Sequence, residues 1–173
     1  MLIEHILHRK GPEVATISAD ATVADAVVEL RDRNIGALVV TGPPAAEQSA
    51  SGEPAGADEG TAAGQPAGEP PAISGILSER DVVRALAEAA PDTAAALAQP
   101  VAALMSTDLA TCGPRATVDE LMRLMTDRRI RHVPVLDGGR LAGIVSIGDV
   151  VKSRIDELET ETETLHEYLS SGR

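Results

Sequence analysis

A chain of 173 residues has room for one domain or two small ones, and 43% of its residues are hydrophobic, although Phe and Trp are absent. The formal net charge of −12 and the presence of only one aromatic side chain among Phe, Trp and Tyr, that of Tyr168, disfavour a nucleic-acid partner, which is bound through clustered Lys and Arg and stacked side chains. A single cysteine excludes an internal disulfide framework, and no apolar run is long enough for a signal peptide or a membrane span, so we expect a cytoplasmic protein.

The first half predicts a short helix over 2–7 and a strand over 14–17. The Thr22 and Asp25 pair is typical of a helix start, and the apolar residues after it follow helical spacing. Two paired strands are expected over 37–40 and 73–77. A helix should follow from Glu79 to about Ala90.

The segment 43–72 separates these two strands. It contains no Val, Ile, Leu or basic residue, and it carries five acidic residues. Such a segment cannot bury enough apolar surface to offset the entropy of ordering it. We therefore expect a disordered insertion at the tip of a hairpin.

The second half repeats the first. "TISADATVADAVVELRDRNIGALVV" from Thr16 lies over "TCGPRATVDELMRLMTDRRIRHVPV" from Thr111 at an offset of 95, and "ISGILSERDVVRA" lies over "LAGIVSIGDVVKS" at an offset of 68. Each copy reads as β-α-β-β-α. In the second copy residues 137–140 predict a tight hairpin, and Pro134 should occupy an edge or non-donating position of its strand.

The repeat predicts a first domain over 1–90, a partly helical linker over 91–100, a second domain over 101–155 and an acidic tail over 156–173. From the end of the second domain into the tail, Ile155, Leu158, Leu165 and Leu169 fall on roughly one helical face. This pattern fits a helix that packs on a partner subunit and equally a solvated terminal helix.

The phrases "GILSERD" and "GIVSIGD" place Ser78 three residues before Asp81 and Ser146 three residues before Asp149. One interpretation is local, because Ser followed by Asp at this spacing caps a helix and Gly75 and Gly143 allow close packing. The other is a ligand site. A strand that ends at a helix N-terminus suits phosphate, and the Asp can accept hydrogen bonds from ribose hydroxyls.

These phrases, with "RHVPVLD" at 131–137 and "VAALMS" at 101–106, make the chain similar to a tandem pair of CBS domains, also called a Bateman module. The resemblance implies an α/β (α+β) fold of two β-α-β-β-α domains related by a pseudo-twofold axis and assembled as a homodimer. It also implies a cleft between the domains that binds AMP, ADP, ATP, NAD or S-adenosylmethionine and regulates a target protein.

If the family's ligand-binding roles are transferred to the matching positions of this sequence, the resemblance implies that Asp81 and Asp149 hold ribose hydroxyls and that Ser78 and Ser146 approach phosphate. The remaining candidates line the adenine pocket or flank it: Thr16, Ile17, Thr111, Gly36, Ala37, His132, Val133 and Pro134.

The two copies differ in charge. Arg80 faces Gly148 in the repeat, whereas Arg131 and His132 face Gly36 and Ala37. The arginines suit phosphate and His132 suits pH tuning, although each also fits a surface or structural role. Because Arg80 has no counterpart, we expect phosphate mainly on the side of the first copy.

We expect no enzyme, no required cofactor and no metal site. Cys112 lacks a flanking His or cation that would activate it, and His5 and His8 lack further ligands at metal spacing. The alternatives to a nucleotide sensor are an S-adenosylmethionine module and a purely structural dimerisation module, against which the presence of both Asp residues argues.

Overall fold

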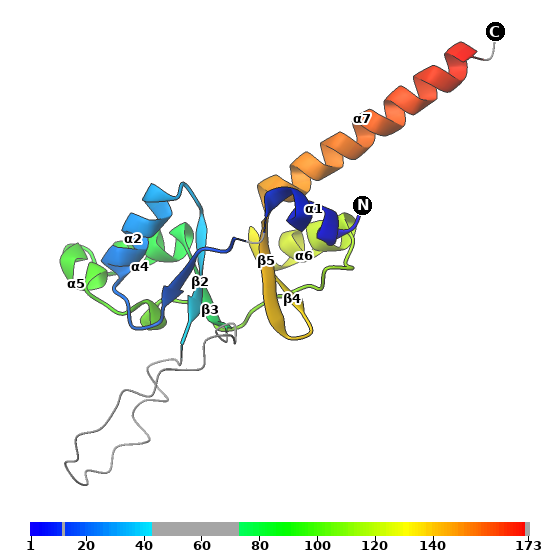
Figure 1. The fold of residues 1–173 in the computed structure, drawn as a ribbon. Helices are drawn as coiled ribbons and strands as arrows, with labels where there is room; N and C mark the ends of the chain where they lie inside the picture. Colours follow the sequence, from blue (N-terminus) through cyan, green and yellow to red (C-terminus); the bar gives the residue numbers. More distant parts are fainter. Residues whose placement is uncertain (12, 43–72, 172–173) are drawn as a thin grey trace. The chain divides into compact units, whose positions relative to one another are not determined.

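The computed structural model describes residues 1–11, 13–42 and 73–171 (Figure 1). The predicted insertion at 43–72 lies outside the described residues. The chain divides into two compact units: the first-copy unit, Ala15–Leu109, and the second-copy unit, which joins Met1–Val14 to Ala110–Arg173.

The first-copy unit contains a three-stranded sheet in the order β1-β2-β3, parallel between β1 and β2 and antiparallel between β2 and β3. Its elements are β1 (Thr16–Ser18), α2 (Val23–Asp32), β2 (Ala37–Thr41), β3 (Ile73–Ser78), α4 (Glu79–Glu88), α5 (Thr93–Leu97) and the 3-10 helix η1 (Val101–Ala103). The predicted Thr22–Asp25 cap starts α2, and Val23, Ala26 and Leu30 bury its apolar face against the sheet. All the elements predicted for this copy are confirmed within a few residues.

The second-copy unit contains α1 (Ile3–Lys10), α6 (Val118–Arg128), β4 (His132–Asp137), β5 (Arg140–Ser146) and α7 (Ile147–Ser171). Strands β4 and β5 form an antiparallel hairpin, and its two turn residues, Gly138 and Gly139, have positive φ values of 55° and 82°. Such a turn needs glycine because both central residues are left-handed. The tight hairpin is therefore confirmed.

The opening strand of the second copy is reduced to an isolated bridge between Cys112 and Val135. In the first-copy unit the N–H of Val39 donates to the carbonyl of Ala15 over 3.1 Å and helps to hold β1. The repeat places Pro134 opposite Val39, and proline has no N–H to donate. The side chain of Pro134 lies buried in β4, with its nitrogen on the strand edge that faces the bridge.

The segments that lead into the two copies are exchanged between the units. Helix α1 precedes the first copy, yet Ile3 and Ile6 are fully buried in the core of the second-copy unit. The 3-10 helix η1 precedes the second copy, yet Val101 is buried in the core of the first-copy unit. The observed boundaries therefore differ from the predicted ones at 90 and 101, because each lead-in buries its apolar residues against the other copy.

Helix α7 continues from the second copy into the predicted tail without a break. Its first turns pack on the unit through Val150 and Ser153, both fully buried, and Figure 1 shows its second half projecting beyond α1 and α6. Among the described residues, no helix has the length and apolar character needed to cross a membrane.

Candidate functional site

Both repeated phrases fold into a junction between a strand and a helix. Where β3 meets α4, the backbone N–H and the hydroxyl of Ser78 donate to Oδ2 of Asp81 over 3.0 and 2.6 Å. Where β5 meets α7, the same groups of Ser146 donate to Oδ2 of Asp149 over 2.8 and 2.7 Å. The local interpretation is thus confirmed, because each carboxylate satisfies the start of its helix.

Each junction also includes the start of the neighbouring strand. Ala37 pairs with Ser78, and the N–H of Glu79 donates to the carbonyl of Gly36 over 3.1 Å. In the second-copy unit His132 pairs with Ser146, and the N–H of Ile147 donates to the carbonyl of Arg131 over 2.8 Å. The first-copy junction therefore gathers Gly36, Ala37, Ser78 and Asp81, with the exposed Arg80 in the first turn of α4. The second-copy junction gathers Arg131, His132, Ser146 and Asp149.

The other predicted residues lie further along the strands. The side chains of Ile17, Val133 and Pro134 are buried, so they offer a ligand no side-chain contact. Thr16 is exposed on the edge strand β1, opposite Val39. Thr111 is exposed beside the Cys112 bridge.

The backbone of Cys112 has partners of its own. Its N–H donates to the carbonyl of Pro134 over 3.2 Å, and its carbonyl accepts from the N–H of Leu136 over 2.9 Å. The Cys112 N–H, next to the predicted adenine-pocket residue Thr111, is therefore already engaged within the protein.

Each carboxylate has a cationic partner that the sequence analysis missed. Arg84, one turn along α4, donates to Oδ1 of Asp81 over 3.0 Å, and its side chain is 61% exposed. Lys10, from α1, donates over 2.9 Å to Oδ2 of Asp149, the oxygen that also accepts from Ser146. The spacing of three residues could have revealed Arg84, whereas Lys10 is distant in sequence and reaches Asp149 only because α1 packs on the second-copy unit.

These contacts affect the acidity of Asp149. Burial alone would raise the pKa of this carboxyl, but hydrogen bonds from Ser146 and Lys10 and the charge of Lys10 outweigh burial. The pKa of Asp149 consequently lies below its ordinary value, so the group is ionised at neutral pH.

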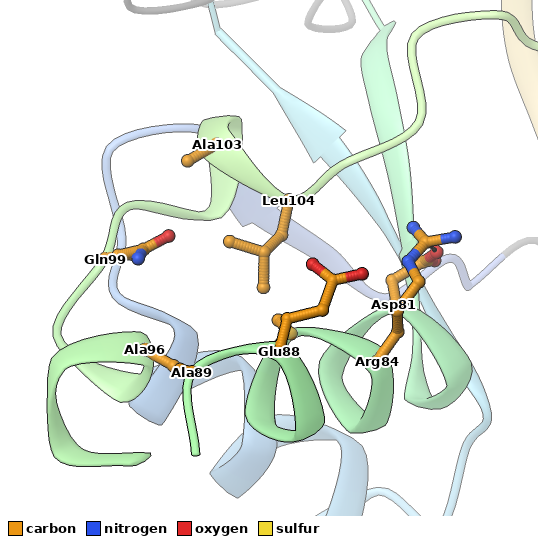
Figure 2. A pocket seen from close by; sticks show the side chains of 9 residues that line it. Asp81, Arg84, Glu88, Ala89, Ala96, Gln99, Ala103 and Leu104 are labelled. Atoms are coloured by element: carbon orange, nitrogen blue, oxygen red, sulfur yellow. Dashed lines mark hydrogen bonds and ion pairs between the residues drawn. The ribbon is translucent and has the colours of Figure 1, made fainter. Parts of the chain in front are cut away.

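Each carboxylate borders a cavity within its own unit. Asp81 and Arg84 stand at one end of a cavity of about 350 Å³ and Gln99 at the other, with Glu88 and Leu104 between them in the view of Figure 2. Most of the remaining wall is made of alanines. The cavity beside Asp149, about 180 Å³, is lined by three cations, Arg9, Lys10 and Lys152.

The described residues give little support to nucleophilic catalysis by Cys112 or to metal binding by His5 and His8. Burial raises the pKa of the Cys112 thiol to about 11, which makes this cysteine a weak nucleophile. His5 and His8 border a third cavity with Glu4 and Glu157, but the part of the chain that the structure describes contains no cluster of three or more His, Cys, Asp or Glu residues placed to hold a metal ion.

Comparison with known proteins supports the interpretation of the repeat. The family model described as "CBS domain" matches residues 4–44 and 101–156, more than half of the chain. A solved CBS-domain-containing protein from Agrobacterium tumefaciens is 38% identical, with a TM-score of 0.68 over 89% of this chain and 99% of that one.

Two further matches broaden this picture. A mitochondrial CBS domain-containing protein of Arabidopsis thaliana, CBSX3, is 33% identical over 90% of this chain, which spans 63% of that relative's length. A CBS domain pair solved in complex with 5′-methylthioadenosine and S-adenosyl-L-methionine is 20% identical, with a TM-score of 0.64 over 91% of this chain and 98% of that one, and shares the fold. With two copies of the domain, a family match over both and the same fold in solved relatives, this chain belongs to the CBS-domain family as a tandem CBS pair.

Proposed function

We propose that this CBS pair is a regulatory module that binds an adenine nucleotide, such as AMP, ADP, ATP or NAD, and acts on a target protein through a homodimer whose state depends on the ligand. The observation that carries the proposal is the junction of strand and helix present in both copies, with Ser and Asp at a helix N-terminus. We also propose that the protein works in the cytoplasm, in keeping with its single cysteine.

The chemistry of the first-copy junction suits a nucleoside. The side chain of Asp81 is only 12% exposed, whereas that of its partner Arg84 is 61% exposed, and an exposed ion pair of this kind contributes little free energy, so another donor could replace Arg84. Two vicinal ribose hydroxyls could then donate to Asp81. The N-terminus of α4 adds partial positive charge for an anionic group, and Arg80 adds a full one.

The second-copy junction differs in its charges. Asp149 is already paired with Lys10, so a ribose would have to compete with an ammonium group for this carboxylate. His132 begins the adjoining strand β4 and Arg131 directly precedes it, and Arg9 and Lys152 lie beside Asp149. We propose that the first-copy junction binds the nucleoside more strongly and that Arg131 contributes to phosphate binding.

A thermal-shift panel tests the proposal, because a ligand that binds only the folded state raises the melting temperature. AMP, ADP, ATP, NAD, adenosine and S-adenosylmethionine would each be titrated to millimolar concentration. A shift with the phosphorylated ligands supports the nucleotide sensor. A shift with S-adenosylmethionine alone would transfer the assignment to that ligand, and no shift at all would leave a structural dimerisation module.

Substitutions at the junctions locate the site. We expect Asp81→Ala to abolish most of the shift with phosphorylated ligands, and Asp149→Ala to reduce it less. The matched control is Asp25→Ala. Asp25 caps α2 through Thr22 with the same distances, 3.0 and 2.6 Å, so the control loses an equivalent cap outside the proposed site. If Asp25→Ala reduced the shift as much as Asp81→Ala, the effect would come from stability and not from binding.

The role of Arg131 requires a comparison of ligands. If Arg131 contacts phosphate, Arg131→Ala should weaken the binding of AMP about tenfold or more and that of adenosine little, since a charge-assisted hydrogen bond contributes about 1.5–3 kcal/mol. Isothermal titration with both ligands measures the two ratios. Equal losses for AMP and adenosine would refute this role.

A further inference from the structure

Helix α7 carries a regular series of exposed apolar residues. Val151, Ile155, Leu158 and Leu169 are between 44% and 72% exposed. With Thr162, and with position 165 in the sequence, they follow one another at alternating spacings of four and three residues. This is the heptad pattern of a coiled coil, with 155, 162 and 169 at a positions and 151, 158 and 165 at d positions.

The series does not belong to the core of the chain. Helix α7 packs on its own unit through Val150 and Ser153, which are fully buried. At about 100° per residue the exposed series lies roughly a third of a turn away from that face. The fold therefore anchors the start of the helix and leaves the apolar series on a different side.

We propose that α7 pairs with α7 of a second copy of this chain in a parallel two-stranded coiled coil. This surface is separate from the two junctions, so the proposal does not depend on ligand binding. Three heptads are marginal for an isolated peptide, but here the first turns of the helix are already held by the folded unit.

The charges beside the apolar series favour the parallel orientation. In a parallel pair, Arg154 at a g position faces Glu159 at an e position of the other helix, and Glu161 faces His166. In an antiparallel pair with the same apolar layers, Glu159 would face Glu159 and Glu161 would face Glu161. Within one chain Arg154 donates to Glu157 over 2.6 Å, on the same side of the helix. Arg154 can therefore contact both Glu157 of its own chain and Glu159 of the other helix.

Disulfide trapping tests whether α7 pairs with α7 of a second copy. The test remains valid if another surface of the protein also holds two copies together. In a Cys112→Ser background, Leu169→Cys places a thiol in the apolar series, and Thr160→Cys places one at an f position outside it. We expect Leu169→Cys to form a disulfide dimer at least about tenfold faster, because only the a position brings the two Cα atoms within bridging distance. Equal rates would overturn the proposal.

The orientation is read from a mixture of Val151→Cys and Leu169→Cys proteins in the same background. A parallel pair gives disulfides within each kind, whereas an antiparallel pair gives disulfides between the two kinds. Predominance of mixed disulfides would overturn the parallel arrangement.

A second measurement uses three similar threonines of α7. Thr160, Thr162 and Thr164 each donate to the carbonyl four residues before them, over 2.8–2.9 Å, and only Thr162 lies in the apolar series. Thr162→Ile should tighten self-association about tenfold in sedimentation equilibrium, since a β-branched apolar residue at an a position favours parallel dimers. Thr160→Ile adds the same side chain outside the series and should leave association unchanged. Equal effects of the two substitutions would contradict the pairing.

Discussion

At the first-copy junction the carbonyl of Ile76 accepts a hydrogen bond from the backbone N–H of Ser106, whereas at the second-copy junction the equivalent carbonyl, that of Ile144, accepts one from the side chain of Lys10. Ser106 and Lys10 both belong to lead-in segments that pack on the other copy. The helix caps are almost identical in the two copies, because Ser and Asp form them locally. What surrounds the caps differs, because it comes from elsewhere in the chain.

The difference has a consequence for function. In the first copy the carbonyl has a backbone partner, and the cation beside Asp81 is the exposed Arg84. In the second copy Lys10 donates both to the carbonyl and to Asp149. Two similar phrases can therefore present a carboxylate with different availability to a ligand. Both copies keep the Ser–Asp helix cap. The charge beside each cap depends on which lead-in segment packs on that copy.

The glycines of the two phrases give the largest expected difference. A Cβ on Gly75 would lie 2.7 Å from the Met105 sulfur and 3.0 Å from the backbone carbonyl of Ser106. The three atoms nearest to a Cβ on Gly143 all belong to the flexible side chain of Leu7, which can turn away. We expect Gly75→Ala to cost about 2–3 kcal/mol of unfolding free energy and Gly143→Ala about 1 kcal/mol, as overpacking against backbone and against a flexible side chain.

Urea unfolding of the two variants and the parent protein measures both costs. Combining Gly143→Ala with Leu7→Ala tests the cause, since the added methyl group should then cost less than it does alone. A cost for Gly143→Ala as large as that for Gly75→Ala would show that Leu7 is held as rigidly as the backbone of Ser106.

The missing strand of the second copy gives a smaller effect that can be tested in both directions. Val39→Pro removes the N–H that bonds to Ala15, and it should destabilise the first-copy unit by about 1–3 kcal/mol. Pro134→Val supplies the missing donor, and it should gain at most about 1 kcal/mol because the loss of proline makes the unfolded chain more flexible. Hydrogen exchange of the new amide at 134 reports whether the bond forms. An unprotected amide would mean that residues 110–112 are held away from β4 by something other than proline.

The local elements could be predicted from the sequence because the residues that determine them are close together. Thr22 with Asp25 marks the start of α2, and the two glycines after Asp137 mark the hairpin turn. The repeat then carried these predictions from one copy to the other, and the family model and solved relatives confirmed the fold.

The exchange of lead-ins could not be predicted in the same way. Ile3 and Ile6 have the spacing of a helix that packs on a core, but nothing local in that pattern distinguishes the core of one copy from that of the other. The ion pair of Lys10 with Asp149 depends on this exchange, and so the sequence analysis missed it. Pro134 was identified as a residue that cannot donate, but its effect on the strand opposite could be seen only from the bonds that Val39 makes.

The ion pair between Lys10 and Asp149 should make the stability of the second-copy unit depend on pH. The folded-state pKa of Asp149 is lowered from 3.8, so the stability that its charge contributes is present at neutral pH and is lost as the pH falls through that lowered value. Lys10→Met should lower the free energy of unfolding by about 0.5–1 kcal/mol at pH 7, and its difference in stability from the parent protein should disappear toward pH 2.

Arg84→Met removes the partner of Asp81, which is more exposed than Lys10, and should lower the free energy of unfolding by less. Urea midpoints measured at several pH values distinguish the two, and a loss for Lys10→Met that persisted at pH 2 would mean that its stem stabilises the fold by packing and not by charge.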